Sequence, residues 1–142
     1  MNRTLYFWPV LALCLTALAG CIDEYPEGPL VSPLPHAVRV VNTWRWSYAL
    51  ENGLNRTGER ADSTIQFTQD RVVKICEAGT ANCREGKWEL VRKNQKLNLI
   101  FGEKAFAYDI LLLREFEMWL SLADTAAGQS VDWELRPYKA PE

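Results

Sequence analysis

The chain has 142 residues, with 16 Lys or Arg against 18 Asp or Glu, so its formal charge is −2 at pH 7. A balance this mild, without any basic block, argues against nucleic acid as a partner. An apolar fraction of 48% is enough for the core of one domain.

Residues 1–20 have the pattern of a bacterial secretory signal. Arg3 is the only charge before an almost wholly apolar run over residues 5–18, and a basic start followed by a short apolar stretch is typical of such signals. A membrane-spanning helix needs about 20 apolar residues, which is more than this run offers. The run ends in the sequence LAGC at 18–21, which resembles the lipobox of bacterial lipoproteins.

The lipobox resemblance implies that Cys21 is lipidated and becomes the first residue of the mature protein. The mature chain would then have 122 residues and a formal charge of −3, because 15 basic and all 18 acidic residues lie in it. It implies a lipid-anchored protein of the cell envelope, in the outer membrane, on its periplasmic face or at the cell surface. The alternatives are a transmembrane anchor and an ordinary cleaved signal.

The four cysteines can be assigned separately. Cys14 leaves with the signal and Cys21 takes the lipid, so Cys76 and Cys83 remain in a compartment where disulfides persist. We expect a disulfide between them, which would stabilise the fold by roughly 2–3 kcal/mol. A zinc site is the weaker alternative, because the only histidine, His36, lies far away in sequence. We therefore expect neither a metal nor another cofactor.

The segment after Cys21 is rich in proline, with Pro at 26, 29, 33 and 35. Proline at this density disfavours helix and sheet and favours extended polyproline II structure. We expect a semi-rigid tether over residues 21–39, with His36 as a solvated residue in it. A β-domain over 40–137 and a short tail over 138–142 follow.

From residue 40 onward, apolar and polar residues alternate with a period of two, as they do in antiparallel strands with one buried face. In the first strand the predicted inward residues are Trp44, Trp46, Tyr48 and Leu50. Eight strands are predicted, at about 40–50, 62–68, 71–76, 84–92, 96–101, 104–112, 116–123 and 129–136.

The predicted turns set a register. A two-residue turn at 102–103 would pair Leu99 with Phe106, and a turn at 93–94 would pair Trp88 with Leu99. If Cys76 lies opposite Cys83, Ile75 faces Arg84. Keeping Ile110 on the face of Met118 requires a three-residue loop at 113–115, where we expect a bulge.

Eight sequential strands form either a closed barrel or a two-sheet sandwich. We expect an all-β, antiparallel, up-and-down eight-stranded barrel, since closure removes both edges. A transmembrane barrel is disfavoured, because the apolar face is bulky and aromatic. The domain resembles the lipocalin-like domains of Gram-negative lipoproteins in NTW at 42–44, GKWEL at 86–90, KLNL at 96–99 and WEL at 133–135. This resemblance implies a barrel without fixing a ligand.

The sequence shows no catalytic constellation, so we expect a protein that is not an enzyme. Our preferred function is an accessory module that docks onto an envelope protein, motivated by Trp119, which is out of phase with its neighbours and is a candidate interface residue. The alternatives are a binder of a small apolar ligand and a protease inhibitor. Seven rings either line a ligand pocket or simply fill the barrel: Trp44, Trp46, Phe67, Trp88, Phe106, Tyr108 and Trp133.

Overall fold

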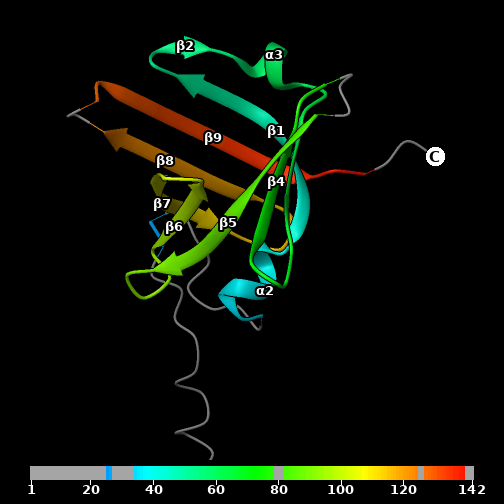
Figure 1. Ribbon diagram of the computed structural model, residues 1–142, viewed down its shortest axis with the longest axis vertical. Coiled ribbons are helices and arrows are strands. Elements are labelled where there is room, and N and C mark those ends of the chain that lie inside the picture. Colours follow the sequence, from blue (N-terminus) through cyan, green and yellow to red (C-terminus); the bar gives the residue numbers. More distant parts are fainter. Residues whose placement is uncertain (1–24, 27–33, 79–81, 125–126, 140–142) are drawn as a thin grey trace, which may run out of the picture.

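The computed structural model describes residues 25–26, 34–78, 82–124 and 127–139 (Figure 1). The predictions for the signal, for Cys21 and for most of the tether lie outside the described residues. Within the described residues, no helix combines the length and the apolar character needed to cross a membrane.

The strands form one antiparallel sheet that closes on itself. In the described residues they are β1 (Asn42–Glu51), β2 (Leu54–Asn55), β3 (Thr64–Phe67), β4 (Val72–Cys76), β5 (Cys83–Val91), β6 (Lys96–Phe101), β7 (Lys104–Leu113), β8 (Met118–Asp124) and β9 (Gln129–Pro137). Each strand from β3 to β8 pairs with the next, and β1 pairs with both β3 and β9. The short β2 lies outside this ring, so the closed barrel has eight strands, as predicted.

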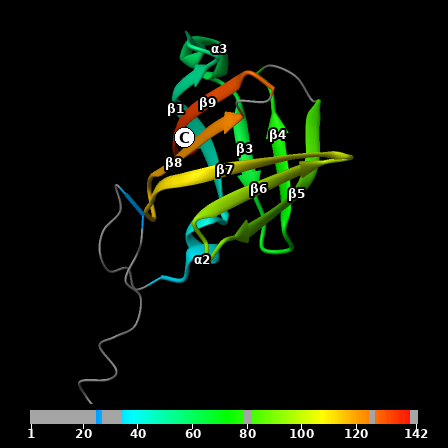
Figure 2. The ribbon, with the colours of Figure 1, turned by 90° about the vertical axis from the view of Figure 1, so that its left-hand side faces the viewer.

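Two short helices lie at opposite ends of the barrel (Figures 1 and 2). They are α2 (His36–Val40), which precedes β1, and α3 (Thr57–Arg60), which lies between β2 and β3. We call the end near α2 the closed end and the end near α3 the open end.

The predicted register is confirmed at three hairpins. Leu99 pairs with Phe106, Trp88 with Leu99, and Ile75 with Arg84. Lys93 and Asn94 both have positive φ, of 55° and 67°, as a type I′ hairpin turn requires. The φ of Gly102, 61°, fits the first central position of a type II′ turn.

The predicted disulfide is also present. Cys76 and Cys83 are bonded and directly opposite each other at the ends of β4 and β5. The covalent link therefore joins two strands at the open end, in the register that the apolar pattern requires.

The hairpin between β7 and β8 differs from the prediction. The expected three-residue loop at 113–115 is wrong, because Leu113 is the last residue of β7 and pairs with Met118. The expected bulge exists, but it lies within the strand, between Ile110 and Leu112. An extra residue in the strand shifts the alternation by one, so that both Ile110 and Leu113 reach the core.

A second bulge in β1 was not predicted. The pairing of β1 with β9 shifts register between Trp46 and Tyr48. Beyond this point Ala49 is buried, whereas Tyr48 and Leu50 are only half-buried. The prediction that Tyr48 and Leu50 continue the inward face of Trp44 and Trp46 is therefore wrong.

The end of the predicted tether is helical and packed, not extended. The helix α2 begins directly after Pro35 and buries Arg39 and Val40. The Trp44 indole N–H donates to the Val40 carbonyl at 2.9 Å, and an Arg39 N–H donates to the Leu113 carbonyl. An apolar residue and two backbone acceptors thus hold the helix on the barrel, which outweighs the extended preference of the preceding prolines.

Two aromatic residues of the same segment also contact the folded domain. Tyr25 is buried, and its hydroxyl donates to the Asn94 carbonyl at 2.7 Å. His36 is half-buried and meets the Tyr25 ring edge-to-face at 5.5 Å, so it is not the solvated residue that we expected.

Gly86 allows β5 and β6 to pack closely. A Cβ at this position would lie 2.3 Å from the Ile100 carbonyl oxygen and 2.6 Å from Cδ1 of Phe101. The Phe101 ring therefore occupies the space that a side chain would take. The carbonyl belongs to the backbone of a paired strand and has little freedom to move.

We expect Gly86→Ala to lower the free energy of unfolding by about 1–3 kcal/mol through overpacking. Gly58→Ala is the matched control, because no atom lies within 4 Å of its Cβ position in α3 and alanine favours helix. Urea denaturation of the two variants measures the difference. Equal stabilities would contradict the close approach at Gly86.

Candidate functional site

The closed half of the barrel is filled by aromatic side chains. Trp44, Phe67 and Trp88 are almost completely buried. The Trp88 indole N–H donates to the Thr68 carbonyl at 3.0 Å, and its ring meets Phe67 edge-to-face at 5.8 Å. The indole N–H groups of Trp44 and Trp88 both have backbone partners, and these three rings are core.

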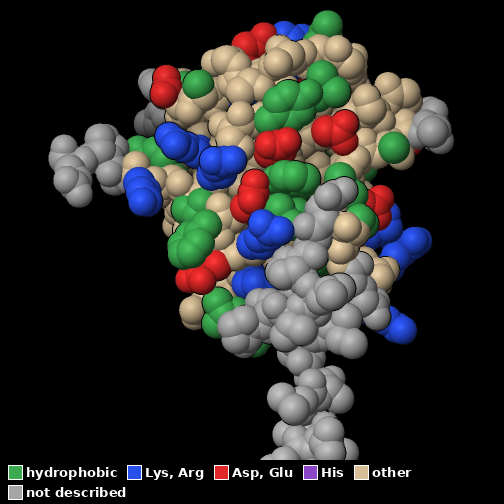
Figure 3. Space-filling view, turned by 180° about the vertical axis from the view of Figure 1, so that it is seen from behind, with side chains coloured by type: hydrophobic (Ala, Val, Ile, Leu, Met, Phe, Trp, Pro, Cys, Tyr) green, Lys and Arg blue, Asp and Glu red, His purple; other side chains and the backbone are tan. Residues whose placement is uncertain are grey.

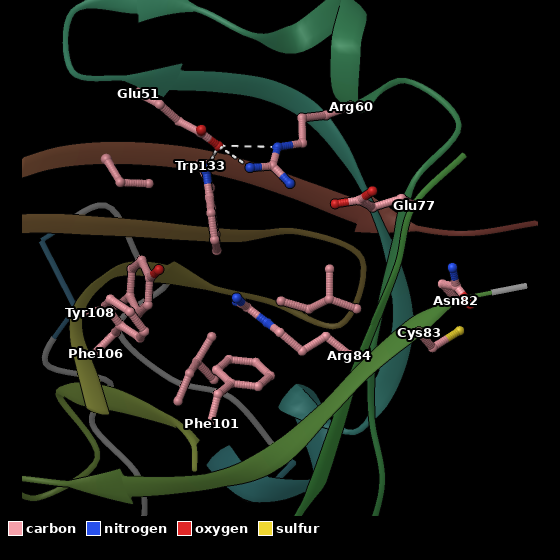
Figure 4. A pocket seen from close by; sticks show the side chains of 13 residues that line it. Glu51, Arg60, Glu77, Asn82, Cys83, Arg84, Phe101, Phe106, Tyr108 and Trp133 are labelled. Carbon is pink, nitrogen blue, oxygen red and sulfur yellow. Dashed lines mark hydrogen bonds and ion pairs between the residues drawn. The ribbon is translucent and has the colours of Figure 1, made fainter. Parts of the chain in front are cut away.

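The open half is hollow. A cavity of about 630 Å³, which we call the cup, opens at the end marked by α3 (Figure 4). Ligand sites for small molecules are typically about 300–1,000 Å³. Its apolar lining comprises Ile75, Leu99, Phe101, Phe106, Tyr108, Val131 and Trp133, and its polar lining includes Glu51, Arg60, Glu77, Asn82 and Arg84.

Aromatic rings separate the cup from the filled half. Trp133 stacks on Tyr108 with ring centroids 5.0 Å apart and an angle of 25°. On its other side Trp133 meets Trp46 edge-to-face at 5.5 Å. Trp46 is buried beside the cup without being part of its lining. Of the seven rings singled out from the sequence, the structure brings Phe106, Tyr108 and Trp133 together in the cup.

A carboxylate with three donors occupies one side of the cup. Oε1 of Glu51 accepts from Nε of Arg60 at 3.1 Å, from Nη2 of Arg60 at 2.8 Å and from the Trp133 indole N–H at 3.2 Å (Figure 4). Both charged side chains are about three-quarters buried. The charge of Arg60 is therefore balanced within the cup by Glu51.

The bulge in β1 is the reason that the Glu51 side chain lines the cup. An unbroken alternation from Trp44 and Trp46 would direct residue 50 inward and residue 51 outward. The register shift after Trp46 reverses this order, so Ala49 is buried and Glu51 lines the cup. Sequence reasoning missed Glu51, because alternation alone gives no sign of a bulge.

Arg84 extends from β5 into the middle of the cup (Figure 4). Its guanidinium lies over the Phe101 ring, 4.1 Å from the centroid. Among the described residues, no carboxylate lies within ion-pair distance of Arg84. This residue was not among the predicted site residues, although the predicted pairing of Ile75 with Arg84 already directs it inward.

The remaining predicted site residues lie elsewhere. Cys83 is at the rim of the cup, bonded to Cys76. Trp119 is half-buried on β8, and its indole N–H donates to Oε1 of Glu117 at 3.1 Å. The exposed aromatic residue of this region is Phe116, which was not predicted and whose exposed fraction is 66%. Cys21 lies outside the described residues.

Comparison with known proteins returns no family: neither a protein-family model nor a curated protein matches the chain. The closed eight-stranded antiparallel barrel fits a lipocalin-like fold. Within the residues that the structure describes, no group of three His, Cys, Asp or Glu side chains is placed to hold a metal ion.

Tyr108 lines the cup, and its side chain is buried. Burial raises the pKa of its phenol to about 12, and the charge of Glu51 acts in the same direction, against the opposing effects of Arg84 and Arg60. The folded state thus keeps the phenol proton at pH values where the unfolded chain, with a pKa of 10.0, loses it.

This difference makes stability depend on pH. The stabilisation is complete below pH 10 and is lost as the pH rises toward 12, because proton loss then favours the unfolded state. We expect the unfolding free energy of the native protein to fall over this range by about 2–3 kcal/mol more than that of Tyr108→Phe. Urea titrations at a series of pH values measure it, and parallel curves would contradict a buried phenol.

Proposed function

We propose that this protein is a non-enzymatic binding module, lipid-anchored in the bacterial envelope, that takes up a small and largely apolar molecule in the cup. The observation that carries this proposal is the hollow half of the barrel. A barrel of eight strands is just wide enough either to be filled by its own side chains or to hold one small ligand. Here the rings fill only the closed half.

The composition of the cup supports a ligand site over a packing defect. Apolar and aromatic walls surround a few convergent polar groups, which is the usual make-up of a small-molecule site. The polar groups are ordered by specific contacts, since Glu51 holds Arg60 and Trp133 while Phe101 supports Arg84.

The placement of α2 supports a lipid anchor at the end of the barrel opposite the cup. This helix directly follows the proline-rich segment and packs on the closed end (Figures 1 and 2). A lipid on Cys21 would therefore attach through the closed end, and the cup would open at the other end. With interspersed acidic, basic and apolar side chains on the rear face (Figure 3), we propose no nucleic-acid partner.

The accessory-module function is the weaker candidate. Trp119, which suggested it, is half-buried, and the support that the structure offers is the exposure of Phe116 on the β7–β8 loop. Recovery of the bait alone in a pull-down from native envelopes would remove this candidate. The protease-inhibitor alternative was based on the proline-rich arm, most of which lies outside the described residues.

Ligand binding can be tested with 2-naphthamide, a flat, neutral molecule that fits the cup. We expect saturable binding to the lipidated mature chain in nanodiscs of neutral lipid, measured by calorimetry against empty nanodiscs. Val131→Trp fills the cup and should weaken binding by about tenfold or more. Val38→Trp, on an exposed position of α2 at the closed end, should leave binding unchanged. Equal affinities in all three proteins would contradict the cup as the site.

The anchor can be tested by intact mass spectrometry after expression in a Gram-negative host. We expect a mature chain that starts at Cys21 and carries the added mass of its acyl groups. Cys21→Ser should lack that mass. Cys14→Ser, a matched change within the signal, should retain it. A protein that starts elsewhere, or an unmodified Cys21, would refute the lipoprotein assignment.

A further inference from the structure

We propose that the ligand of the cup is a compact molecule with a single carboxylate on a flat apolar body, and that Arg84 binds the carboxylate. This inference rests on the proposed function, because it names the chemical class of the molecule that the cup takes up. Arg84, Phe101 and Gly86 carry the argument.

The first step concerns charge. The cup contains two guanidinium groups, and Glu51 already holds that of Arg60 through two hydrogen bonds. The guanidinium of Arg84 meets a ring instead of a carboxylate. A guanidinium that stacks on a ring uses its face, so the N–H donors at its edge stay available for a bidentate carboxylate.

The second step concerns the support of the Arg84 side chain, which is exposed to solvent and rests on a ring. Phe101 supports the guanidinium from below, and Phe101 can lie there only because Gly86 has no side chain. The neighbouring residue, Cys83, is linked to Cys76 on the adjacent strand. A donor group held in place before binding loses little conformational freedom on binding, and this favours affinity.

The third step concerns the shape of the ligand. The Arg84 guanidinium projects among Phe101, Tyr108 and Trp133 (Figure 4), and aromatic walls favour stacking with a flat ring. The stacked pair of Tyr108 and Trp133 lies beside the buried Trp46, and the volume of about 630 Å³ limits the size of the ligand. The ligand is therefore compact.

The fourth step concerns the number of ligand charges. Glu51 and Glu77 also line the cup, so the four charged side chains in its lining sum to zero. A single negative charge can pair with Arg84, whereas the second charge of a dianion such as a phosphate monoester gains little from a lining without net charge and costs more to remove from water. The cup should consequently prefer a carboxylate to a phosphate.

The test compares three probes that share one ring system: 2-naphthoate, the neutral 2-naphthamide and 2-naphthyl phosphate. Calorimetry uses the lipidated mature chain in neutral-lipid nanodiscs at pH 7.5, with empty nanodiscs as the blank. We expect naphthoate to bind at least about tenfold more tightly than naphthamide, and more tightly than the phosphate.

Arg84→Met should abolish the preference for naphthoate over naphthamide. Arg84→Lys should reduce this preference, because lysine keeps the positive charge but lacks the planar guanidinium that binds a carboxylate through two N–H groups. Arg45→Met is the control, because Arg45 is exposed on the outside of β1, between the buried Trp44 and Trp46. The ratio of the two affinities decides the outcome, so a general loosening of the cup in a variant does not affect the result.

The outcomes separate this inference from the proposed function. If naphthamide binds and naphthoate binds no more tightly, or if Arg84→Met keeps the ratio, the inference is wrong while the cup remains a binding site. Tighter binding of the phosphate would overturn the carboxylate class. If neither naphthamide nor naphthoate binds to the native protein, the proposed function fails and the inference fails with it.

Discussion

The pairing of β1 with β9 is the constraint on which the rest of the structure depends. These strands lie at opposite ends of the domain sequence, and their ladder joins Trp46 to Leu135 and Glu51 to Val131. The closure removes both sheet edges, which would otherwise offer unpaired N–H and C=O groups to other chains. It also places Trp133 within hydrogen-bonding distance of Glu51, so the same pairing that completes the barrel assembles one side of the cup.

The bulge in β1 determines what the interior contains at the open end. A regular strand would send Tyr48 and Leu50 inward and continue the apolar filling of the closed half. The register shift buries the small Ala49 and turns Glu51 toward the cup instead. A carboxylate there needs donors, and Arg60 of α3 together with Trp133 supplies them. One extra residue in a strand thus converts part of a core into a polar wall, an effect that bulges have next to functional sites.

The two halves of the barrel use the same residue types differently because of what covers each end. At the closed end α2 buries Val40 and accepts the Trp44 N–H, and the rings below it pack as core. At the open end Arg84 and the pair of Glu51 and Arg60 project among the rings, since solvent reaches their charges there. Gly86 leaves room for the Phe101 ring, and the Arg84 guanidinium lies over that ring. The aromatic residues form a core at one end and line the cup at the other.

Alternation and turn residues determined the eight strands of the ring and the register of three hairpins, because side chains in a strand alternate with a period of two and Asn and Gly permit the turns at Asn94 and Gly102. The disulfide followed from assigning the four cysteines one by one. The same register already directed Arg84 inward. Only the tertiary structure decided the positions of both bulges, the inward turn of Glu51 and the helix at His36–Val40. These depend on contacts with strands distant in sequence, such as β9 for Glu51 and the Leu113 carbonyl for Arg39. Whether the interior is full or hollow was decided in the same way, because it follows from which rings meet after the barrel closes.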